Sequence, residues 1–354
     1  MKTSEWVSLG HPDKIADFIS EYILDRYIEK DPKVRYAVEV QIKDNHVSLA
    51  GEVTSTAEFA DQDIELFVKK AVNVIGYTKI YQGKFGDVNT ICGGDIYVDN
   101  YISSQSPDIA CGVNKDAWGD QGIFFGYFSH ETESGMGKDY DLAKKIGNAI
   151  YEKALLPEYP LGIDIKTQVS INDDGEVEQV IVAVPTVEGD KTHKKIVNKI
   201  IKSFCNPKKT IINGTGEYHI HGPVGDCGTT GRKLVVDFYG GRSRIGGGSP
   251  WTKDGSKADL TLNIFAHDCA KTFFHEISKT THVDHAESEL CCCIGKQEIS
   301  CTCTAYDENG VAITSIENKA KIKPSELIEL YKLDKPIYSE LCYKGILTAV
   351  NNRG

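Results

Sequence analysis

One unit of secondary structure recurs along the chain and limits the folds open to it. In the first unit, apolar side chains at helical spacing over residues 12–29 predict an amphipathic helix. Alternating apolar residues then predict two strands, 36–42 and 47–53, joined by a two-residue turn at Asp44-Asn45. A second helix is expected over residues 61–77.

The same order returns twice more. The later helices and strands are predicted, in chain order, at 140–156, 166–184, 193–205, 257–274, 288–306 and 325–331. We therefore predict an α+β protein of three related units in a pseudo-threefold arrangement, with helices packed on antiparallel or mixed sheets. No low-complexity linker separates the units, so we expect interlocked, discontinuous domains at 1–104, 116–218 and 220–354.

The composition narrows the class of protein. With 40% hydrophobic and 26% charged residues, the 354-residue chain resembles an average soluble protein. Its net charge of −11 argues against a general nucleic-acid binder. No apolar run approaches the roughly 18 residues of a membrane helix, and the first residues lack a secretory signal. We expect a cytoplasmic protein with neither nucleic-acid nor membrane partners.

Five of the 11 cysteines cluster near the C-terminal end, at 291–293, 301 and 303. Paired C-x-x-C steps, typical of zinc sites, are absent there. Neighbouring side chains on a strand point to opposite faces, so three adjacent cysteines cannot share one face. We expect reduced thiols packed as small apolar side chains in a hairpin, with a metal site as the alternative.

Glycines and basic residues gather in one segment. Residues 210–257 hold 12 of the 33 glycines, and residues 231–257 carry six Lys or Arg against two Asp. Backbone amides and cations together can hold a polyphosphate with the help of a metal ion. A solvated basic loop is the alternative. The common G-x-x-x-x-G-K-[ST] nucleotide motif is absent.

The start of the first predicted helix is another candidate ligand site. Gly10-His11-Pro12-Asp13-Lys14 opens the first predicted helix, whose amino end favours phosphate, while Asp13 can hold magnesium. An ordinary helix cap is the alternative.

The predicted turn pairs Lys43 with His46, which brings Glu39 and Glu52 to one sheet face in diagonal proximity. Two carboxylates suit a metal ion or a substrate ammonium group, and a solvated strand face is the alternative. Asp120 and Asp226, each flanked by glycine, are candidate ligands or ordinary turn residues.

Several motifs in this order resemble those of the S-adenosylmethionine synthetase family. They lie at 10–17, 119–122, 225–228, 231–233 and 246–248, with further landmarks at 106–109 and 213–216. The resemblance runs from Ser4 to about Asp268, and residues 336–338 look like the family's tail. It implies a methionine adenosyltransferase that makes S-adenosylmethionine from ATP and L-methionine and releases phosphate and diphosphate. It also implies two Mg²⁺ per site, K⁺, and a homodimer or dimer of dimers with shared sites.

The resemblance also implies a role for particular residues. The residues implied to bind ATP are His11, Asp120, Asp164, Lys166, Tyr218, Asp226, Arg232, Lys233, Ser249 and Lys253. Those implied to bind methionine are Glu52, Gln105, Asp226 and Lys257. The catalytic set would be His11, Lys166, Arg232, Lys253 and Lys257. Asp13 and Asp259 would bind magnesium, and Glu39 would bind potassium.

Some positions depart from the family pattern. The departures are Trp118, Glu217, His221, the stretch 249–254 and Leu260, which stands where the family has an arginine. The lysines and acids remain, so we expect activity. One alternative is a triphosphatase or nucleotide hydrolase that has lost methionine, and another is a non-catalytic regulatory partner. Glu52 and Gln105 favour the transferase, because a hydrolase does not need them.

Overall fold

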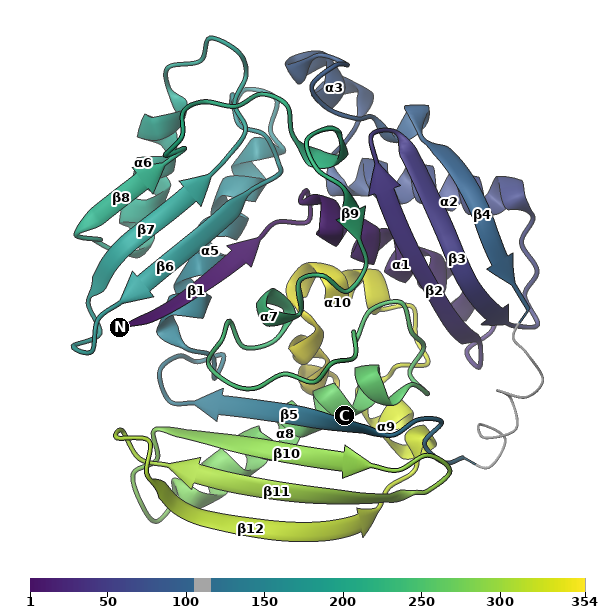
Figure 1. Ribbon diagram of the computed structural model, residues 1–354, viewed down its shortest axis with the longest axis vertical. Helices are drawn as coiled ribbons and strands as arrows, with labels where there is room; N and C mark the ends of the chain where they lie inside the picture. The colour runs from purple at the N-terminus through teal and green to yellow at the C-terminus, as the bar shows by residue number, and fades with distance from the viewer. Residues whose placement is uncertain (105–115, 354) are drawn as a thin grey trace.

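A computed structural model of the protein describes residues 1–104 and 116–353. Its strands form three four-stranded sheets around a common centre, in a roughly threefold arrangement (Figure 1). Helices pack on each sheet, so the α+β architecture of three units is confirmed. None of the helices in the described ranges is both long and apolar enough to cross a membrane.

The first sheet has the strand order β4-β3-β2-β9. Its elements and the neighbouring helices are α1 (Pro12–Ile28), β2 (Arg35–Lys43), β3 (His46–Thr54), α2 (Asp61–Ile75), α3 (Lys79–Phe85), β4 (Tyr97–Ser103) and β9 (Gly228–Thr229). The predicted turn is confirmed, because Lys43 pairs with His46 and Asp44 adopts a φ of +50°. Glu39 consequently lies opposite Ala50, and Glu52 opposite Ala37.

The second sheet has the order β1-β6-β7-β8. Its elements are β1 (Lys2–Val7), α5 (Lys138–Ala154), β6 (Lys166–Ile171), β7 (Val177–Ala183), α6 (His193–Phe204) and β8 (Lys209–Ile212). Helix α5 packs on β1 and β6.

The third sheet has the order β12-β11-β10-β5. Its elements and neighbours are β5 (Gly122–Ser129), α7 (Leu234–Asp237), α8 (Ala258–Ile277), β10 (His285–Cys292), β11 (Glu298–Tyr306), β12 (Ala312–Lys321), α9 (Pro324–Tyr331) and α10 (Tyr338–Lys344). Short 3₁₀ turns lie at Gly93–Asp95, Gly222–Val224 and Ile346–Asn352.

Each sheet contains a strand distant in sequence from its neighbours. β1 pairs with β6, β9 pairs with β2, and β5 pairs with β10 (Figure 1). Separation of the units would therefore break sheet hydrogen bonds. The domain boundaries drawn from the sequence stay a prediction.

The six predicted helices are confirmed within three residues at most ends, but α1 differs in character. It is not amphipathic, because 15 of its 17 residues are buried. It lies where the units meet, against α2, β2, β9 and α10, so it has no solvent face. The sequence reading also missed the short helices α3, α7 and α10 and the strands β1, β4, β5, β8, β9 and β12. β5 is a nearly continuous apolar run, and β12 is exposed along almost its whole length, so neither shows regular alternation.

The predicted cysteine hairpin is confirmed as β10 and β11. Cys292 and Cys303 are buried, as expected, whereas Cys291 and Cys293 are exposed. The expectation of apolar packing is therefore right for the first pair and wrong for the second. The reason is the alternation of strand faces.

Candidate active site

The amino end of α1 lies at the junction of the units, and His11 caps it. The His11 Nδ1 atom accepts a hydrogen bond from the Asp13 amide, at 3.2 Å. Burial, followed by the nearby positive charges of Lys233 and Lys166, lowers the pKa of His11 to about 3. The imidazole is therefore neutral at pH 7. Because Nδ1 accepts, the remaining proton is on Nε2, which can donate to a ligand.

Four carboxylates follow at intervals of four residues on one face of α1: Asp13, Asp17, Glu21 and Asp25. We call them the α1 acid row. Each accepts a backbone N–H from the C-terminal part of the chain. The donors are Thr229 to Asp13 (2.9 Å), Gly231 to Asp17 (2.9 Å), Thr252 to Glu21 (2.6 Å) and Tyr338 to Asp25 (2.9 Å). The row thus fixes much of the glycine-rich segment along α1.

Asp13 is the member of the row closest to cations. Lys233 forms an ion pair with it, and the Arg232 Nε atom lies 3.7 Å from Asp13 Oδ1. Burial opposes ionisation of Asp13, but Lys233 and the Thr229 N–H outweigh burial and lower its pKa. Asp13 is therefore charged at neutral pH and suited to bind a cation.

The second unit contributes residues to the region around His11 and Asp13. Asp164 accepts a hydrogen bond from the Gly222 amide at 2.9 Å, and burial raises the pKa of Asp164 to about 6. Lys166, Asp226 and Asp13 are near enough for their charges to act on Asp164. The Tyr218 hydroxyl lies 3.5 Å from the Asp164 carbonyl oxygen. The exposed Lys166 ammonium has no acid partner among the described residues.

We call this group the Asp13 corner. Its members are His11, Asp13, Asp164, Lys166, Tyr218, Asp226, Arg232 and Lys233. The structure therefore brings eight of the residues expected from the sequence into one place.

A second acid–lysine pair lies at the start of α8. Lys253 and Asp259 form an ion pair. A Cβ atom on Gly248 would lie only 2.0 Å from Asp259 Oδ1, so a side chain at this position would displace the Asp259 carboxylate. Asp120 and Asp259 both act electrostatically on Cys292, which places them near each other.

Further residues expected from the sequence belong with the Lys253–Asp259 pair. Lys257 is the residue before the first turn of α8, and its ammonium group has no acid partner in the described ranges. The backbones of Lys253 and Ala37 form an isolated antiparallel β-bridge. Ala37 lies opposite Glu52 on the neighbouring strand. No hydrogen bond or ion pair to another described residue engages the Glu52 carboxylate. We call Glu52, Asp120, Lys253, Lys257 and Asp259 the Asp259 corner.

Two side chains lie beside these groups. Ser249 accepts a hydrogen bond from the Trp251 amide, at 3.1 Å. Glu39 accepts hydrogen bonds from the hydroxyls of Thr230 and Thr252, on the exposed face of its strand. Carboxylate and hydroxyl oxygens suit a hard cation. Gln105 lies outside the described residues.

Thr252 is held in an unfavourable backbone conformation. Its φ is +73°, a region that costs a residue with a Cβ about 1–2 kcal/mol, and it is fully buried. Glu21 accepts from its amide, the Val38 amide donates to its carbonyl at 3.1 Å, and Glu39 accepts from its hydroxyl. These bonds fix the position of the following residue, Lys253. Strain of this kind is common where a side chain must be aimed.

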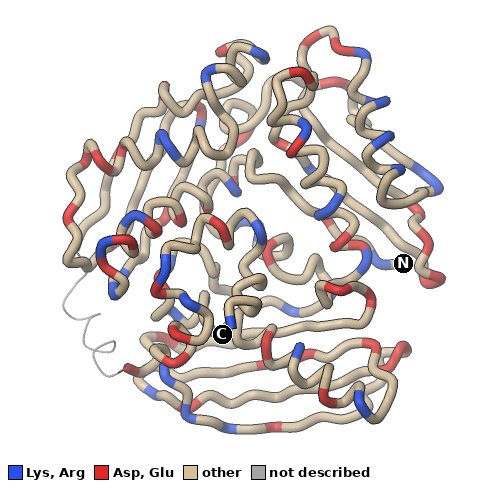
Figure 2. Tube along the Cα trace, turned by 180° about the vertical axis from the view of Figure 1, so that it is seen from behind, with Lys and Arg blue, Asp and Glu red and all other residues tan. Residues whose placement is uncertain are grey.

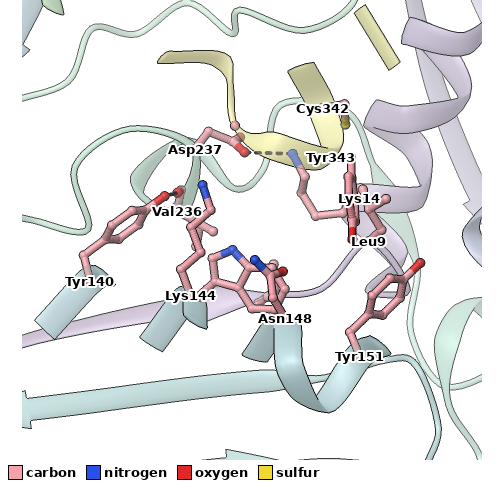
Figure 3. A pocket seen from close by; sticks show the side chains of 13 residues that line it. Leu9, Lys14, Tyr140, Lys144, Asn148, Tyr151, Val236, Asp237, Cys342 and Tyr343 are labelled. Atoms are coloured by element: carbon pink, nitrogen blue, oxygen red, sulfur yellow. Dashed lines mark hydrogen bonds and ion pairs between the residues drawn. The ribbon is translucent and has the colours of Figure 1, made fainter. Parts of the chain in front are cut away.

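Lys14 does not join the site, contrary to the sequence-based expectation. It is buried and pairs with Asp237 at 2.7 Å and with Asp17 at 3.0 Å. Figure 3 shows Lys14 reaching Asp237 beside a small internal cavity of about 30 Å³. Burial alone lowers the pKa of Lys14, but the two carboxylates outweigh it and keep the lysine charged.

The departures from the family pattern are mostly packing residues. Trp118, His221 and Leu260 are buried. Trp251 is also buried, donates from Nε1 to Asp237 at 2.8 Å and lies under Lys14. The Glu217 Oε1 atom lies 3.8 Å from Lys191 Nζ, so the lysine compensates the negative charge of the glutamate. The sequence reading missed Asp17, Glu21, Thr230 and Thr252. Acids at every fourth position of an otherwise apolar helix were the available signal for the first two.

No three His, Cys, Asp or Glu side chains within residues 1–104 and 116–353 come together as a ready-made metal site. The two corners fit magnesium nonetheless, because this ion is usually held by one or two carboxylates together with substrate phosphates. Charges of both signs lie next to each other around the centre of the molecule (Figure 2).

Comparison with known proteins identifies the family of this chain. Residues 1–107 match the N-terminal domain of S-adenosylmethionine synthetase, 115–225 its central domain and 220–352 its C-terminal domain. Among solved structures, the chain is similar to an unusual S-adenosylmethionine synthetase from Campylobacter jejuni. The two are 29% identical, with a TM-score of 0.86 over 99% of this chain and 97% of the other. This chain therefore belongs to the S-adenosylmethionine synthetase family.

Proposed function

We propose that the protein is a methionine adenosyltransferase, which forms S-adenosylmethionine from ATP and L-methionine and releases phosphate and diphosphate. The observation that carries this proposal is the presence of two acid–lysine pairs, Asp13–Lys233 and Lys253–Asp259, beside unpaired lysines. In each pair the acid can turn to a metal ion while the lysine turns to a phosphate oxygen.

The reaction needs stabilisation of a leaving group more than it needs a base. The methionine sulfur is a neutral nucleophile and attacks the C5′ atom of ATP, while negative charge collects on the departing triphosphate. Fixed cations lower the energy of this charge in a dry site. We assign this role to Lys166, Arg232, Lys233, Lys253 and Lys257. The Nε2–H group of the neutral His11 would donate to the leaving oxygen.

The remaining expected residues would hold the two substrates. Asp120, Asp164, Tyr218, Asp226 and Ser249 are proposed contacts of ATP, with Tyr218 stacked on the adenine. Glu52 would bind the ammonium group of methionine, since no other described group engages its carboxylate. Gln105, Asp226 and Lys257 would complete the methionine site.

The oxygen ligands fit the cations that the family uses. Asp13 and Asp259 would each bind Mg²⁺, and Glu39, with the Thr230 and Thr252 hydroxyls beside it, would bind K⁺. When bound, the metal ions supply positive charge that stabilises the phosphate oxygens. The chain's own part is to aim two of these carboxylates: the Thr229 amide holds Asp13, and the Thr230 and Thr252 hydroxyls hold Glu39.

We also propose that two chains share each site. Within the described residues, no hydrogen bond or ion pair joins a member of the Asp13 corner to a member of the Asp259 corner. In a twofold dimer, the Asp13 corner of one chain can face the Asp259 corner of its partner, which gives two complete sites per dimer.

Heterodimers test this arrangement directly. An Asp13→Asn chain and an Asp259→Asn chain carry different tags, and the mixed dimer is purified through both. A shared site leaves one of the two sites intact, so activity should be about half that of the unaltered dimer. The matched control pairs an unaltered chain with a chain carrying both substitutions, and it should be inactive. The opposite pattern would show that each site is built within one chain.

The activity itself is tested with ATP, L-methionine, Mg²⁺ and K⁺. S-adenosylmethionine, phosphate and diphosphate should rise together, and omission of methionine should stop adenosyl transfer. Glu52→Gln should raise the KM for methionine about tenfold with little change for ATP, and exposed Glu58→Gln serves as its control. Phosphate without any adenosyl product would favour the hydrolase. S-adenosylmethionine with intact triphosphate would show that triphosphate cleavage has been lost.

A further inference from the structure

Three cysteines line an apolar groove far along α8 from Lys257 and Asp259. Helix α8 packs mainly on β5, β10 and β11, while β12 forms the outer edge of the sheet (Figure 1). The groove between α8 and the outer strands has a volume of about 340 Å³. Its apolar lining includes Phe265, Phe273, Ile299, Ile316, Ala320 and Ile322, and its thiols are Cys269, Cys301 and Cys303.

The three thiols are close together. Cys301 and Cys303 lie two residues apart on β11 and therefore point to the same face, with their Sγ atoms 3.6 Å apart. Cys269 comes from α8 on the opposite wall. Cys301 is half-buried and Cys303 is buried, so Cys301 is the strand thiol that a ligand in the groove can reach.

The neighbours of Cys301 favour its thiolate. Hydrogen bonding from Cys269, then from Cys303, lowers the pKa of Cys301, and the pKa values of both neighbours are raised. The charged groups on the groove wall are Asp268 and Glu276 of α8 and Arg353, which is ion-paired with Asp268. The lining residues of β12, namely Ile316, Asn318 and Ala320, are uncharged.

A disulfide within β11 is not a ready alternative fate for this thiol. Same-face neighbours on a strand leave the backbone in nearly parallel directions, so their Cβ atoms, like their Cα atoms, are about 6.6 Å apart. A disulfide needs Cβ atoms about 3.5–4.5 Å apart. Because β11 is paired on both sides, by β10 and β12, it cannot bend easily to close that gap. Cys303 therefore does not readily consume the Cys301 thiol.

We propose that Cys301 is a covalent modification site for uncharged α,β-unsaturated carbonyl compounds that bind in this groove. The Cys301 sulfur donates an electron pair to the β-carbon, and a carbon–sulfur bond forms as the carbon–carbon π bond breaks. The resulting enolate regains at its α-carbon the proton that the thiol lost. The addition needs no oxidant or reductant, and it does not depend on the proposed transferase activity.

The test compares the cysteines of one molecule. The full-length protein at pH 7 receives one equivalent of N-phenylmaleimide, and peptide mass spectrometry follows each cysteine. Cys301 should react at least about tenfold faster than the more exposed Cys291 and Cys293. N-(4-carboxyphenyl)maleimide should lose this preference, because the groove lining is apolar. Faster labelling of Cys291 or Cys293 by the neutral reagent, or an equal rate of both reagents at Cys301, would overturn the proposal.

Two further measurements separate thiol activation from simple access. In the unaltered protein, the labelling rate of Cys301 should rise at a lower pH than that of Cys291. Cys303→Ala and Cys269→Ala should each slow labelling of Cys301 at pH 7 several-fold, and the deficit should shrink at pH 10, where an accessible thiol ionises without help from its neighbours. Cys205→Ala is the control and should change neither rate. If the groove variants fail to fold, the pH profile of the unaltered protein still decides, and coincident profiles would contradict activation.

Discussion

Asp13 and Glu21 lie two turns apart on the same face of α1, yet their surroundings give them opposite protonation states. Both are buried, and the Asp13 side chain is only 2% exposed. Both accept a backbone amide from the glycine-rich segment. Cations adjoin Asp13, so its pKa is lowered, whereas burial, with Asp25 and Asp17 as neighbours, raises the pKa of Glu21 well above its usual value.

At these two positions the neighbouring charges, rather than burial alone, set the protonation state. Asp13 lies at the end of the helix beside Lys233 and Arg232, where it stays ionised and suited to a metal ion. Glu21 lies in the middle of the helix, where it is protonated and holds Thr252. An acidic side chain thus serves chemistry at one position and architecture at the other.

The largest effect is expected at the Asp13 end of the row. Asp13→Asn removes the carboxylate proposed to bind magnesium and leaves Lys233 without its acid. Adenosyl transfer should fall at least about 100-fold in kcat/KM, measured as S-adenosylmethionine formed under saturating Mg²⁺. The exposed Asp87→Asn is the matched control and should keep full activity. An Asp13→Asn enzyme with more than a tenth of the normal activity would remove Asp13 from the site.

A similar loss is expected when a cation is removed from the other corner. Lys257→Met deletes a charge proposed to meet methionine or the phosphate chain, and adenosyl transfer should fall at least about 100-fold. Exposed Lys279→Met, just beyond the C-terminal end of α8, should have no effect. Full activity of the Lys257→Met enzyme would mean that the phosphate chain binds elsewhere.

Stability, rather than chemistry, should respond at Glu21. Glu21→Ala opens a cavity and leaves the Thr252 amide without its acceptor, so the free energy of unfolding should fall by about 2–4 kcal/mol. Glu21→Gln keeps the shape and an acceptor oxygen and should stay within about 1 kcal/mol. Urea denaturation measures both. Equal losses in the two variants would show that the Glu21 side chain is ionised in the folded protein.

A change in pH dependence is expected at Asp17. Burial raises the pKa of Asp17 from 3.8 to about 7. Above pH 4 the unfolded chain loses this proton while the folded protein retains it, so the contribution to stability is lost as the pH rises from about 4 to 7. Asp17→Asn should flatten this decline in urea unfolding measured between pH 4 and 7. Asp87→Asn should leave the decline unchanged, and an unchanged Asp17→Asn profile would contradict the raised pKa.

Local pattern determined much of this protein. Helical spacing placed α2, α5, α6 and α9, and the turn at Asp44-Asn45 set the register that brings Glu39 and Glu52 to one face. These features depend on neighbours a few residues apart, which the sequence shows directly. The glycine motifs resembled those of the family, and the structure gives a reason for one of them: a side chain at Gly248 would displace the Asp259 carboxylate.

Tertiary structure decided what the chain does with its polar residues. Lys14 and Asp13 are neighbours in sequence, yet Lys14 turns to Asp237 in the interior while Asp13 turns to Lys233 at the site. The partners lie more than 200 residues away, so no local pattern assigns them. The sequence by itself determined the units, the turns and the residue types of the site. Only the packing of distant segments around α1 decided which carboxylates stay charged, because burial opposes ionisation and the cations and amides that distant segments bring must outweigh it.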